Sequence, residues 1–271
     1  MATGEPSGES SASRAGPALF DLTGKVAAVI GGTGVLGGAV CHGLGGAGAA
    51  VAVMGRSRER ADERVAALEA EGIRSAGVVL DASDRASVEH ARLEVEARLG
   101  PADILVNAAG INSSTPFFEI DLEEWHRILD TNLSSVFIAC QVFGRAMADR
   151  GEGGTIINFS SASSEIPLSR VPIYSVSKAG VNNLTRYLAR ELAPHRIRVN
   201  AILPGFFPAE QNRALLDESR VESILRHTPA ARLGRPDELV GTMLWLASER
   251  ASGFVTGALI RVDGGFSAMT I

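Results

Sequence analysis

Short apolar segments of β type alternate with longer segments of helical pattern along almost the whole chain. The strands that this pattern predicts span residues 25–31, 50–55, 76–80, 103–107, 154–159, 197–203 and 257–262. The predicted helices span residues 35–47, 57–71, 84–99, 122–150, 172–193 and 236–248. Short strands separated by helices of about ten or more residues indicate a parallel sheet covered on both faces. Because crossovers are right-handed, we expect a single doubly wound, Rossmann-type α/β sheet with its ligand at the carboxyl ends of the strands.

The length and composition of the chain fit one large domain. With 271 residues and a hydrophobic content of 45%, the sequence supports a full core, and 30 glycines against 11 prolines suit many tight turns between strands and helices. Residues 19–271 are therefore predicted to form a single domain. Residues 1–18 are rich in Gly, Ser, Ala and Pro and have almost no large apolar side chain, so we expect a disordered tail rather than a secretory signal.

Charge and cysteine content argue against several other classes of protein. The formal net charge is −5 and no basic run is present, which argues against nucleic-acid binding. No segment reaches the ~20 uncharged apolar residues that a membrane span requires. Cys41 and Cys140 both lie in apolar helical segments, which is typical of small core residues rather than of a disulfide. We therefore expect a protein of a reducing compartment, the cytoplasm, and we predict no metal site.

Tyr174 and Lys178 carry the strongest chemical signal. They are four residues apart and lie on one face of the helix predicted over 172–193. The ammonium favours phenolate over phenol, so we expect it to lower the pKa of Tyr174 from about 10, and such a phenol exchanges a proton with a carbonyl or alcohol oxygen. Ser161 stands thirteen residues before Tyr174. A Tyr and a Lys at this spacing also occur by chance, so the interpretation as hydride-transfer chemistry depends on a nucleotide-binding turn elsewhere in the chain.

Such a turn is present at residues 31–38, after the first predicted strand and at the start of the first helix. Glycines there let backbone N–H groups approach a pyrophosphate at the helix N-terminus, which is the signature of dinucleotide binding. The second strand ends in Gly55, where an acidic residue would bond the ribose hydroxyls of NAD. Arg56 and Arg58 follow and suit a 2′-phosphate, so NADP(H) is favoured as the cofactor and NAD(H) is possible. The alternative is that both arginines are merely solvated.

With these features the chain resembles the short-chain dehydrogenase/reductase family from about residue 20 to its end. The matching segments are the glycine turn, N-A-A-G at 107–110, T-N-L-S-S at 131–135, N-F-S-S-A at 158–162, Y-S-V-S-K at 174–178, R-V-N-A-I-L-P-G at 198–205 and V-D-G-G-F at 262–266. The resemblance implies that Ser161 polarises the substrate oxygen and that Tyr174 is the general acid/base. Lys178 would lower the pKa of Tyr174 and hold the nicotinamide ribose, and Asn132 would fix a water that relays protons from Lys178.

The same motifs assign the cofactor contacts. The predicted cofactor-binding residues are Gly31, Thr33, Gly34, Val35, Leu36, Gly37, Arg56, Asp81, Ala82, Asn107, Ala108, Gly110, Tyr174, Lys178, Pro204, Gly205 and Phe207. Asp81, after the third strand, is expected to hold the adenine edge. Ile30 and Val35 stand where the family mostly carries Thr and Gly, so Val35 must keep a negative φ. Pro208 falls where a Thr is often found, which removes one usual contact to the nicotinamide or its phosphate.

Within the family, G-G-x-G-V-L-G-G, V-P-x-Y-S and P-G-F-F-x-x-E-Q-N-R-A-L-L resemble the mannonate (fructuronate) oxidoreductase-like branch, which interconverts a keto-uronate and an aldonate. Such a substrate needs a cation for its carboxylate and hydrogen-bond partners for its hydroxyls. Residues 204–234 fall outside the strand–helix rhythm, and we expect them to form a substrate lid. The predicted substrate-binding residues are Asn112, Arg170, Gln211 and Arg213.

Alternatives to this interpretation stay open. In one alternative, Arg213 faces solvent on a lid helix and Arg170 pairs with a neighbour such as Glu165. In another, the substrate is a polyol, a cyclitol or a 3-oxoacyl thioester. The third alternative is a non-catalytic nucleotide sensor, which would have no reason to keep the catalytic residues together. The helices predicted over 122–150 and 172–193 are apolar on more than one face, and together with the family resemblance this implies a homotetramer.

Overall fold

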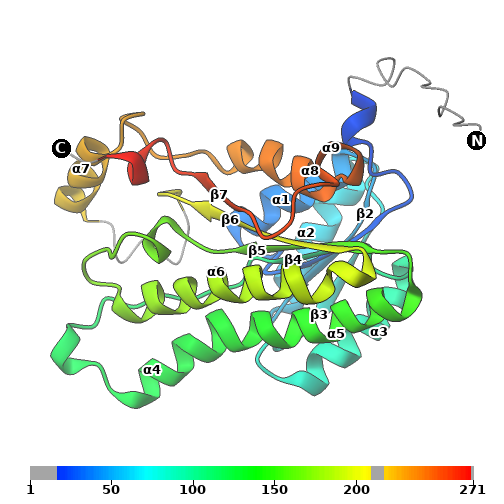
Figure 1. Cartoon of the computed structure of the whole chain (residues 1–271), viewed down its shortest axis with the longest axis horizontal. Helices are drawn as coiled ribbons and strands as arrows, with labels where there is room; N and C mark the ends of the chain where they lie inside the picture. The colour runs from blue at the N-terminus through cyan, green and yellow to red at the C-terminus, as the bar shows by residue number, and fades with distance from the viewer. Residues whose placement is uncertain (1–16, 209–216, 270–271) are drawn as a thin grey trace, which may run out of the picture.

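The structure is a computed structural model that describes residues 17–208 and 217–269. At the centre of these residues lies one sheet of seven parallel strands in the order β3-β2-β1-β4-β5-β6-β7 (Figure 1). The strands are β1 (Val26–Ile30), β2 (Ala50–Gly55), β3 (Ser75–Val79), β4 (Ile104–Asn107), β5 (Gly154–Phe159), β6 (Ile197–Pro204) and β7 (Leu259–Val262). The strand order reverses beside β1, which places a ligand crevice between β1 and β4 at their carboxyl ends. The predicted doubly wound parallel sheet is confirmed.

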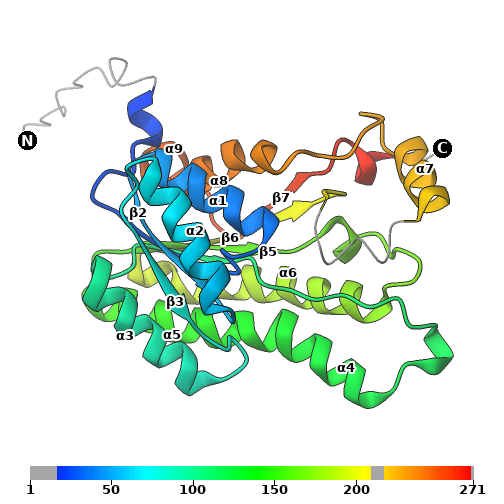
Figure 2. The same ribbon diagram turned by 180° about the vertical axis from the view of Figure 1, so that it is seen from behind.

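Helices cover both faces of the sheet (Figures 1 and 2). One face carries α1 (Val35–Gly46), α2 (Arg58–Ala70), α8 (Val240–Ala247) and the short α9 (Glu249–Ser252). The other carries α3 (Arg85–Leu99), α4 (Leu122–Leu129), α5 (Ser135–Arg150) and α6 (Pro172–Leu192). Each face has its own apolar core, so the strands are buried on both sides and their sequences read as continuous apolar runs.

The predicted helices differ from the structure at three places. The segment predicted as one helix over 122–150 contains a π-helical turn, Asp130–Ser134, between α4 and α5. The predicted helix over 236–248 begins as a 3₁₀ turn, Pro236–Leu239. The helix α7 (Glu218–His227), which was not predicted, lies inside the segment expected to be a lid, and its N-cap is Asp217. The lid role of residues 204–234 stays a prediction.

The two cysteines are core residues, as their apolar surroundings predict. Cys41 on α1 and Cys140 on α5 are both buried and carry free thiols. Burial raises the pKa of each thiol to about 12, because a buried thiolate loses its hydration. Both are therefore protonated at neutral pH and act as small apolar side chains.

The described chain begins with a 3₁₀ helix, Pro17–Phe20, which includes two residues that were assigned to the disordered tail. Residues 1–16 lie outside the described part, so the disordered tail expected up to about residue 18 stays a prediction. Contacts with the end of the chain hold this 3₁₀ helix: Ser248 donates a hydrogen bond to the Leu19 carbonyl, and Arg250 donates one to the Ala18 carbonyl. Among the described residues, no helix is long and apolar enough to span a membrane.

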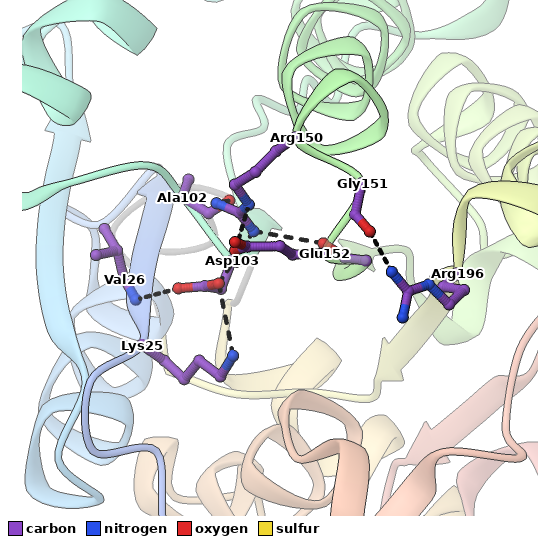
Figure 3. A network of polar contacts seen from close by, with 9 residues as sticks. Lys25, Val26, Ala102, Asp103, Arg150, Gly151, Glu152 and Arg196 are labelled. Carbon is purple, nitrogen blue, oxygen red and sulfur yellow. Dashed lines mark hydrogen bonds and ion pairs between the residues drawn. The ribbon is translucent and has the colours of Figure 1, made fainter.

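An ion-pair network closes the amino-terminal edge of the sheet (Figure 3). The Asp103 carboxylate accepts hydrogen bonds from the Val26 backbone N–H at 2.9 Å and from Nη2 of Arg150 at 3.0 Å. Lys25 lies 3.6 Å from the same carboxylate, and Arg150 also pairs with Glu152 at 3.1 Å. The start of β1, the start of β4 and the end of α5 are thereby fixed together, at the edge opposite the candidate active site.

Candidate active site

Two adjoining cavities lie at the carboxyl ends of the strands. The larger, of about 570 Å³, is formed by the ends of β1 to β4 and the segments that follow them. The predicted cofactor residues that line it are Gly31, Thr33, Gly34, Val35, Leu36, Gly37, Arg56, Asp81, Ala82, Ala108 and Gly110. The smaller, of about 50 Å³, is lined by Ser161 and by the predicted cofactor residues Tyr174, Lys178, Pro204, Gly205 and Phe207. Both cavities share Leu36 and the turn 108–110, so they form one continuous site.

The glycine turn brings three segments of backbone unusually close together. Gly31 has a φ of +88°, and a Cβ added there would lie 2.6 Å from the backbone nitrogen of Ala109. A Cβ on Gly37 would overlap the carbonyl oxygen of Gly31. Val35 is the first residue of α1 and does not have a positive φ, so its predicted negative φ is confirmed. The first turn of α1, capped by Gly34 without a side-chain hydrogen bond, therefore faces the larger cavity with its backbone N–H groups.

The end of the larger cavity beside β2 is basic, although one predicted arginine points elsewhere. Arg56 lines the cavity. Arg58 does not: its guanidinium donates to the Gly77 carbonyl at 3.0 Å and lies 3.7 Å from Asp62, so its assignment to a 2′-phosphate site is not supported. Arg60, which was not predicted, lines the cavity in its place. The signal for it was available, because Arg60 lies four residues after Arg56, on the same side of a helix start.

Two further predicted cofactor residues engage their side chains within the protein. The Asp81 carboxylate accepts hydrogen bonds from the backbone N–H and the hydroxyl of Ser83, at 2.9 and 2.6 Å, and these bonds lower its pKa. It is ionised at neutral pH at the cavity wall. Asn107 lines neither cavity, because its amide donates to Oδ1 of Asn158 at 2.9 Å inside the core. This bond joins β4 to β5, and a direct contact of Asn107 with the cofactor stays a prediction.

Ser161 and Tyr174 come together from different elements. Ser161 follows β5 and caps a 3₁₀ turn, whereas Tyr174 lies in the first turn of α6. Both line the smaller cavity, and the Ser161 hydroxyl lowers the pKa of the phenol. Burial has the larger effect and raises the pKa of Tyr174 above its usual 10. The cost of burying a phenolate dominates in this structure, and the expected lowering of this pKa by Lys178 stays a prediction.

Lys178 lies one helical turn after Tyr174 and is 3% exposed. Its Nζ atom donates to the carbonyl oxygen of Phe159 at 2.9 Å and lies 5.6 Å from the centroid of the Tyr174 ring. Burial lowers the pKa of Lys178 to about 8, because the charged form loses hydration. The side chain is thus held at the carboxyl end of β5, close to the phenol and charged at neutral pH.

Asn132 occupies the π-helical turn between α4 and α5 and is fully buried. Its amide oxygen accepts the N–H of Ile111 at 2.8 Å, and its amide nitrogen donates to the Ile111 carbonyl and to the Ser177 hydroxyl. A Cβ on Gly110 would lie 3.3 Å from Oδ1 of Asn132 and 3.5 Å from Nζ of Lys178, so these two side chains flank the same turn. Such π-helical turns are frequent at functional sites.

The predicted substrate residues lie outside both cavities or outside the described residues. Arg170 donates to Oδ2 of Asp217 at 3.0 Å, and both side chains are about half exposed. The amide oxygen of Asn112 accepts the N–H of Ser113, its neighbour in the chain. Glu165 pairs with Arg261 at 2.6 Å rather than with Arg170. Gln211 and Arg213 lie outside the described residues. Within the described ranges, no cluster of three or more His, Cys, Asp or Glu side chains could hold a metal ion.

Comparisons with known proteins agree with this geometry. A family model described as "Enoyl-(Acyl carrier protein) reductase" matches residues 33–267. The chain is 38% identical to "Uncharacterized oxidoreductase UxuB" of Bacillus subtilis, over 93% of this chain and 98% of that protein. It is 38% identical to 5-keto-D-gluconate 5-reductase of Escherichia coli K12, over 91% of this chain and 97% of the other. A crystal structure of a gluconate 5-dehydrogenase from Burkholderia cenocepacia with NADP and tartrate is 36% identical, covers 93% of this chain and 98% of its own, and has a TM-score of 0.88.

Proposed function

The chain belongs to the short-chain dehydrogenase/reductase family, and on this premise we propose that it interconverts a secondary alcohol and a ketone on a sugar acid, with NADP(H) as the favoured cofactor. It is an enzyme, an oxidoreductase acting on CH–OH groups. The observation that carries the proposal is the meeting of Ser161, Tyr174 and Lys178 in a small cavity that opens into a nucleotide-sized one.

The residues present fit a nicotinamide dinucleotide. A Cβ at Gly37 would overlap the Gly31 carbonyl, so the backbone of the turn is packed too closely for a side chain there. The N-terminus of α1 faces the larger cavity, where its backbone N–H groups would meet a pyrophosphate. Arg56 and Arg60 lie at the far end of the cavity, where a 2′-phosphate would need cations. When bound, the dinucleotide supplies the hydride chemistry, and its nicotinamide end would be held beside Lys178 and the segment from Pro204 to Phe207.

The contacts support the catalytic roles that we propose. Ser161 and Tyr174 line the same small cavity, so an oxygen of the substrate placed between them would accept from both hydroxyls. During reduction Tyr174 gives its proton to the forming alkoxide, and during oxidation it takes the proton back. Lys178 keeps a positive charge near the phenol and so favours the phenolate during turnover. Asn132 fixes the turn at Ile111 and lies beside Lys178, which suits the proton relay expected of it.

The substrate class rests on the relatives, of which one is named for 5-keto-D-gluconate and another for gluconate. A sugar acid of this kind is therefore our first proposal, and the mannonate–fructuronate pair is the finer alternative within it. A neutral polyol is the second candidate. One observation favours it: among the described residues, Lys178 is the only cation lining the smaller cavity, and Arg170 is already paired with Asp217.

The test is a turnover assay of the purified protein with 5-keto-gluconate, fructuronate and neutral keto-sugars of the same length, each with NADPH and NADH. We expect keto-acids with NADPH to give the highest kcat/KM. The Tyr174→Phe variant should lose about two to four orders of magnitude in rate. Tyr187→Phe, which changes the chain's other tyrosine on the same helix, should stay near wild type. Equal rates for Tyr174→Phe and wild type would refute the catalytic assignment, and a preference for neutral substrates would select the polyol.

We also propose that the enzyme is a homotetramer. Phe137 on α5 and both Val176 and Tyr187 on α6 are 44%, 50% and 57% exposed, so these two helices present large apolar side chains outside the core. An apolar helix face of this kind needs a partner surface, and closed symmetry is the usual arrangement of identical subunits.

A further inference from the structure

We propose that Ser163 is a positioning residue of the active site, which makes the Ser161 hydroxyl a pure hydrogen-bond donor toward the substrate oxygen. The inference rests on the proposed function and adds a residue to the machinery around Ser161. Ser163 is 3% exposed and lines neither of the two cavities that form the site. Because its side chain does not reach either cavity, it acts on the reaction through its neighbour.

The Ser161 hydroxyl receives two hydrogen bonds from Ser163. The backbone N–H of Ser163 donates to Oγ of Ser161 at 3.2 Å, and the hydroxyl of Ser163 donates to the same atom at 3.1 Å. A serine hydroxyl has two acceptor lone pairs and one proton to donate. Because Ser163 fills both acceptor positions, the O–H bond of Ser161 is the part of the group left for a ligand, at the wall of the smaller cavity.

A second serine fixes the backbone of the same turn to the helix that carries Tyr174. The hydroxyl of Ser164 donates to the carbonyl oxygen of Ser161 at 2.5 Å and accepts the side-chain amide of Asn182 at 2.8 Å. Asn182 is 5% exposed and lies about two turns after Tyr174 on α6. The place of the Ser161 backbone relative to the phenol is thus set through Ser164, whereas the direction in which its hydroxyl donates is set through Ser163.

The donor-only state of Ser161 decides where the proton of Tyr174 goes. If the Ser161 oxygen had a free lone pair, it would accept the phenol proton and compete for it with the substrate carbonyl. With both lone pairs occupied, the phenol donates to the substrate oxygen, which receives a second hydrogen bond from Ser161. The bonds that Ser161 accepts also strengthen the bond that it donates, because hydrogen bonds in a chain polarise one another. The Ser161 hydroxyl accordingly lowers the pKa of the phenol, as a donor to the phenolate does.

The experiment is a double-mutant cycle on the whole enzyme, which measures kcat/KM for reduction of the ketone that the wild type reduces fastest. Ser161→Ala should lower this value about a hundred- to thousandfold, the scale of one lost donor to a developing oxyanion. In the wild-type background Ser163→Ala should lower it about three- to tenfold, the factor that corresponds to one neutral hydrogen bond. In the Ser161→Ala background the same change should have no effect, because the hydroxyl through which Ser163 acts is missing.

A solvent isotope effect separates this role from a structural one. Loss of the Ser163 hydroxyl should slow proton delivery by Tyr174, so the ratio of the rates in water and heavy water should be larger in Ser163→Ala than in the wild type. Ser164→Ala disturbs the backbone of the turn and should lower the thermal midpoint at an unchanged ratio. Ser252→Ala is the matched control, because Ser252 is also 3% exposed and its hydroxyl donates to the Ser248 carbonyl at α9. It should keep the wild-type rate and ratio.

Several outcomes would overturn the inference. They are a wild-type rate or an unchanged isotope ratio in Ser163→Ala, the same loss from this change in both backgrounds, or full activity of Ser163→Cys. Cysteine fills the space of the hydroxyl but is a weak donor, so it would restore a packing role, whereas we expect it to stay as slow as Ser163→Ala. A wild-type rate for Ser161→Ala, or no turnover of any ketone, would instead refute the proposed function on which the inference rests.

Discussion

Nζ of Lys178 donates a hydrogen bond to the carbonyl oxygen of Phe159 at 2.9 Å, which fixes the ammonium to the last residue of β5. The pair joins the sheet to α6 close to Ser161, which follows β5, and to Tyr174, which lies in the first turn of the helix. Burial in this part of the site changes the pKa values of both side chains. Burial lowers the pKa of the ammonium to about 8 and raises that of the neighbouring phenol, so the site has a charged lysine and a neutral tyrosine at neutral pH.

The two directions of the reaction should depend differently on pH. Since the pKa of Tyr174 is raised above its usual 10, the phenol that reduction needs is fully present at neutral pH. We expect kcat/KM for reduction to be level between about pH 6 and 8 and to fall at higher pH, and that for oxidation to rise with pH because it needs the phenolate. Initial rates in both directions over this range measure the effect. A maximal oxidation rate at or below neutral pH would contradict the assignment of Tyr174 as the base.

Lys178 should lower the stability of the free enzyme. Its pKa is 10.5 in the unfolded chain and about 8 in the folded protein, so below about pH 8 folding must bury a charge. Between these two values the unfolded chain binds a proton that the folded protein has released, and wild-type stability rises with pH. We expect Lys178→Met to increase the free energy of unfolding by about 1–3 kcal/mol at pH 7, less the lost hydrogen bond.

Denaturant unfolding of both proteins at a series of pH values checks this sign. The advantage of Lys178→Met should be complete below about pH 8 and should shrink as the pH approaches 10.5. A variant that is less stable than wild type at pH 7 would show that the bond to Phe159 outweighs the burial of the charge.

The nucleotide turn should tolerate no side chain at Gly37. The Cβ of Gly37→Ala would overlap the Gly31 carbonyl, which is backbone and cannot move aside without opening the turn. We expect a loss of about 1–3 kcal/mol in stability together with severely weakened nucleotide binding, measured by thermal unfolding and fluorescence titration. Gly46→Ala, at the other end of α1, meets nothing within 4 Å. It should bind normally and gain up to about 1 kcal/mol from helix propensity, and equal behaviour of the two variants would refute the argument.

The proposed assembly is tested by light scattering at micromolar concentration, where we expect four times the subunit mass of 28.3 kDa. Tyr187→Glu places a charge on the apolar face of α6 and should shift the protein to smaller species. Leu93→Glu, on α3, changes an apolar side chain of similar exposure, 53%, and should leave the mass unchanged. A monomeric wild type would refute the tetramer.

The sequence alone predicted all seven strands of the described sheet to within about two residues at each end. It succeeded because a parallel sheet covered on both faces needs unbroken apolar strands and intervening helices, and both are local patterns. The positions of the strands along the chain also located most of the site. Residues that directly follow a strand must lie at its carboxyl end, so Gly31, Arg56, Ala108 and Ser161 were placed by chain order.

What tertiary structure decided is where long side chains point and which distant segments meet. Arg58 and Arg60 are two residues apart and equally basic, but helical geometry turns the first toward Gly77 and the second into the cavity. Arg170 pairs with Asp217, 47 residues away, through a contact that no periodicity records. The raised pKa of Tyr174 likewise comes from burial in the assembled site rather than from its spacing to Lys178. Local pattern determines which elements form, whereas burial, charge pairing and solvation exist only once those elements are packed.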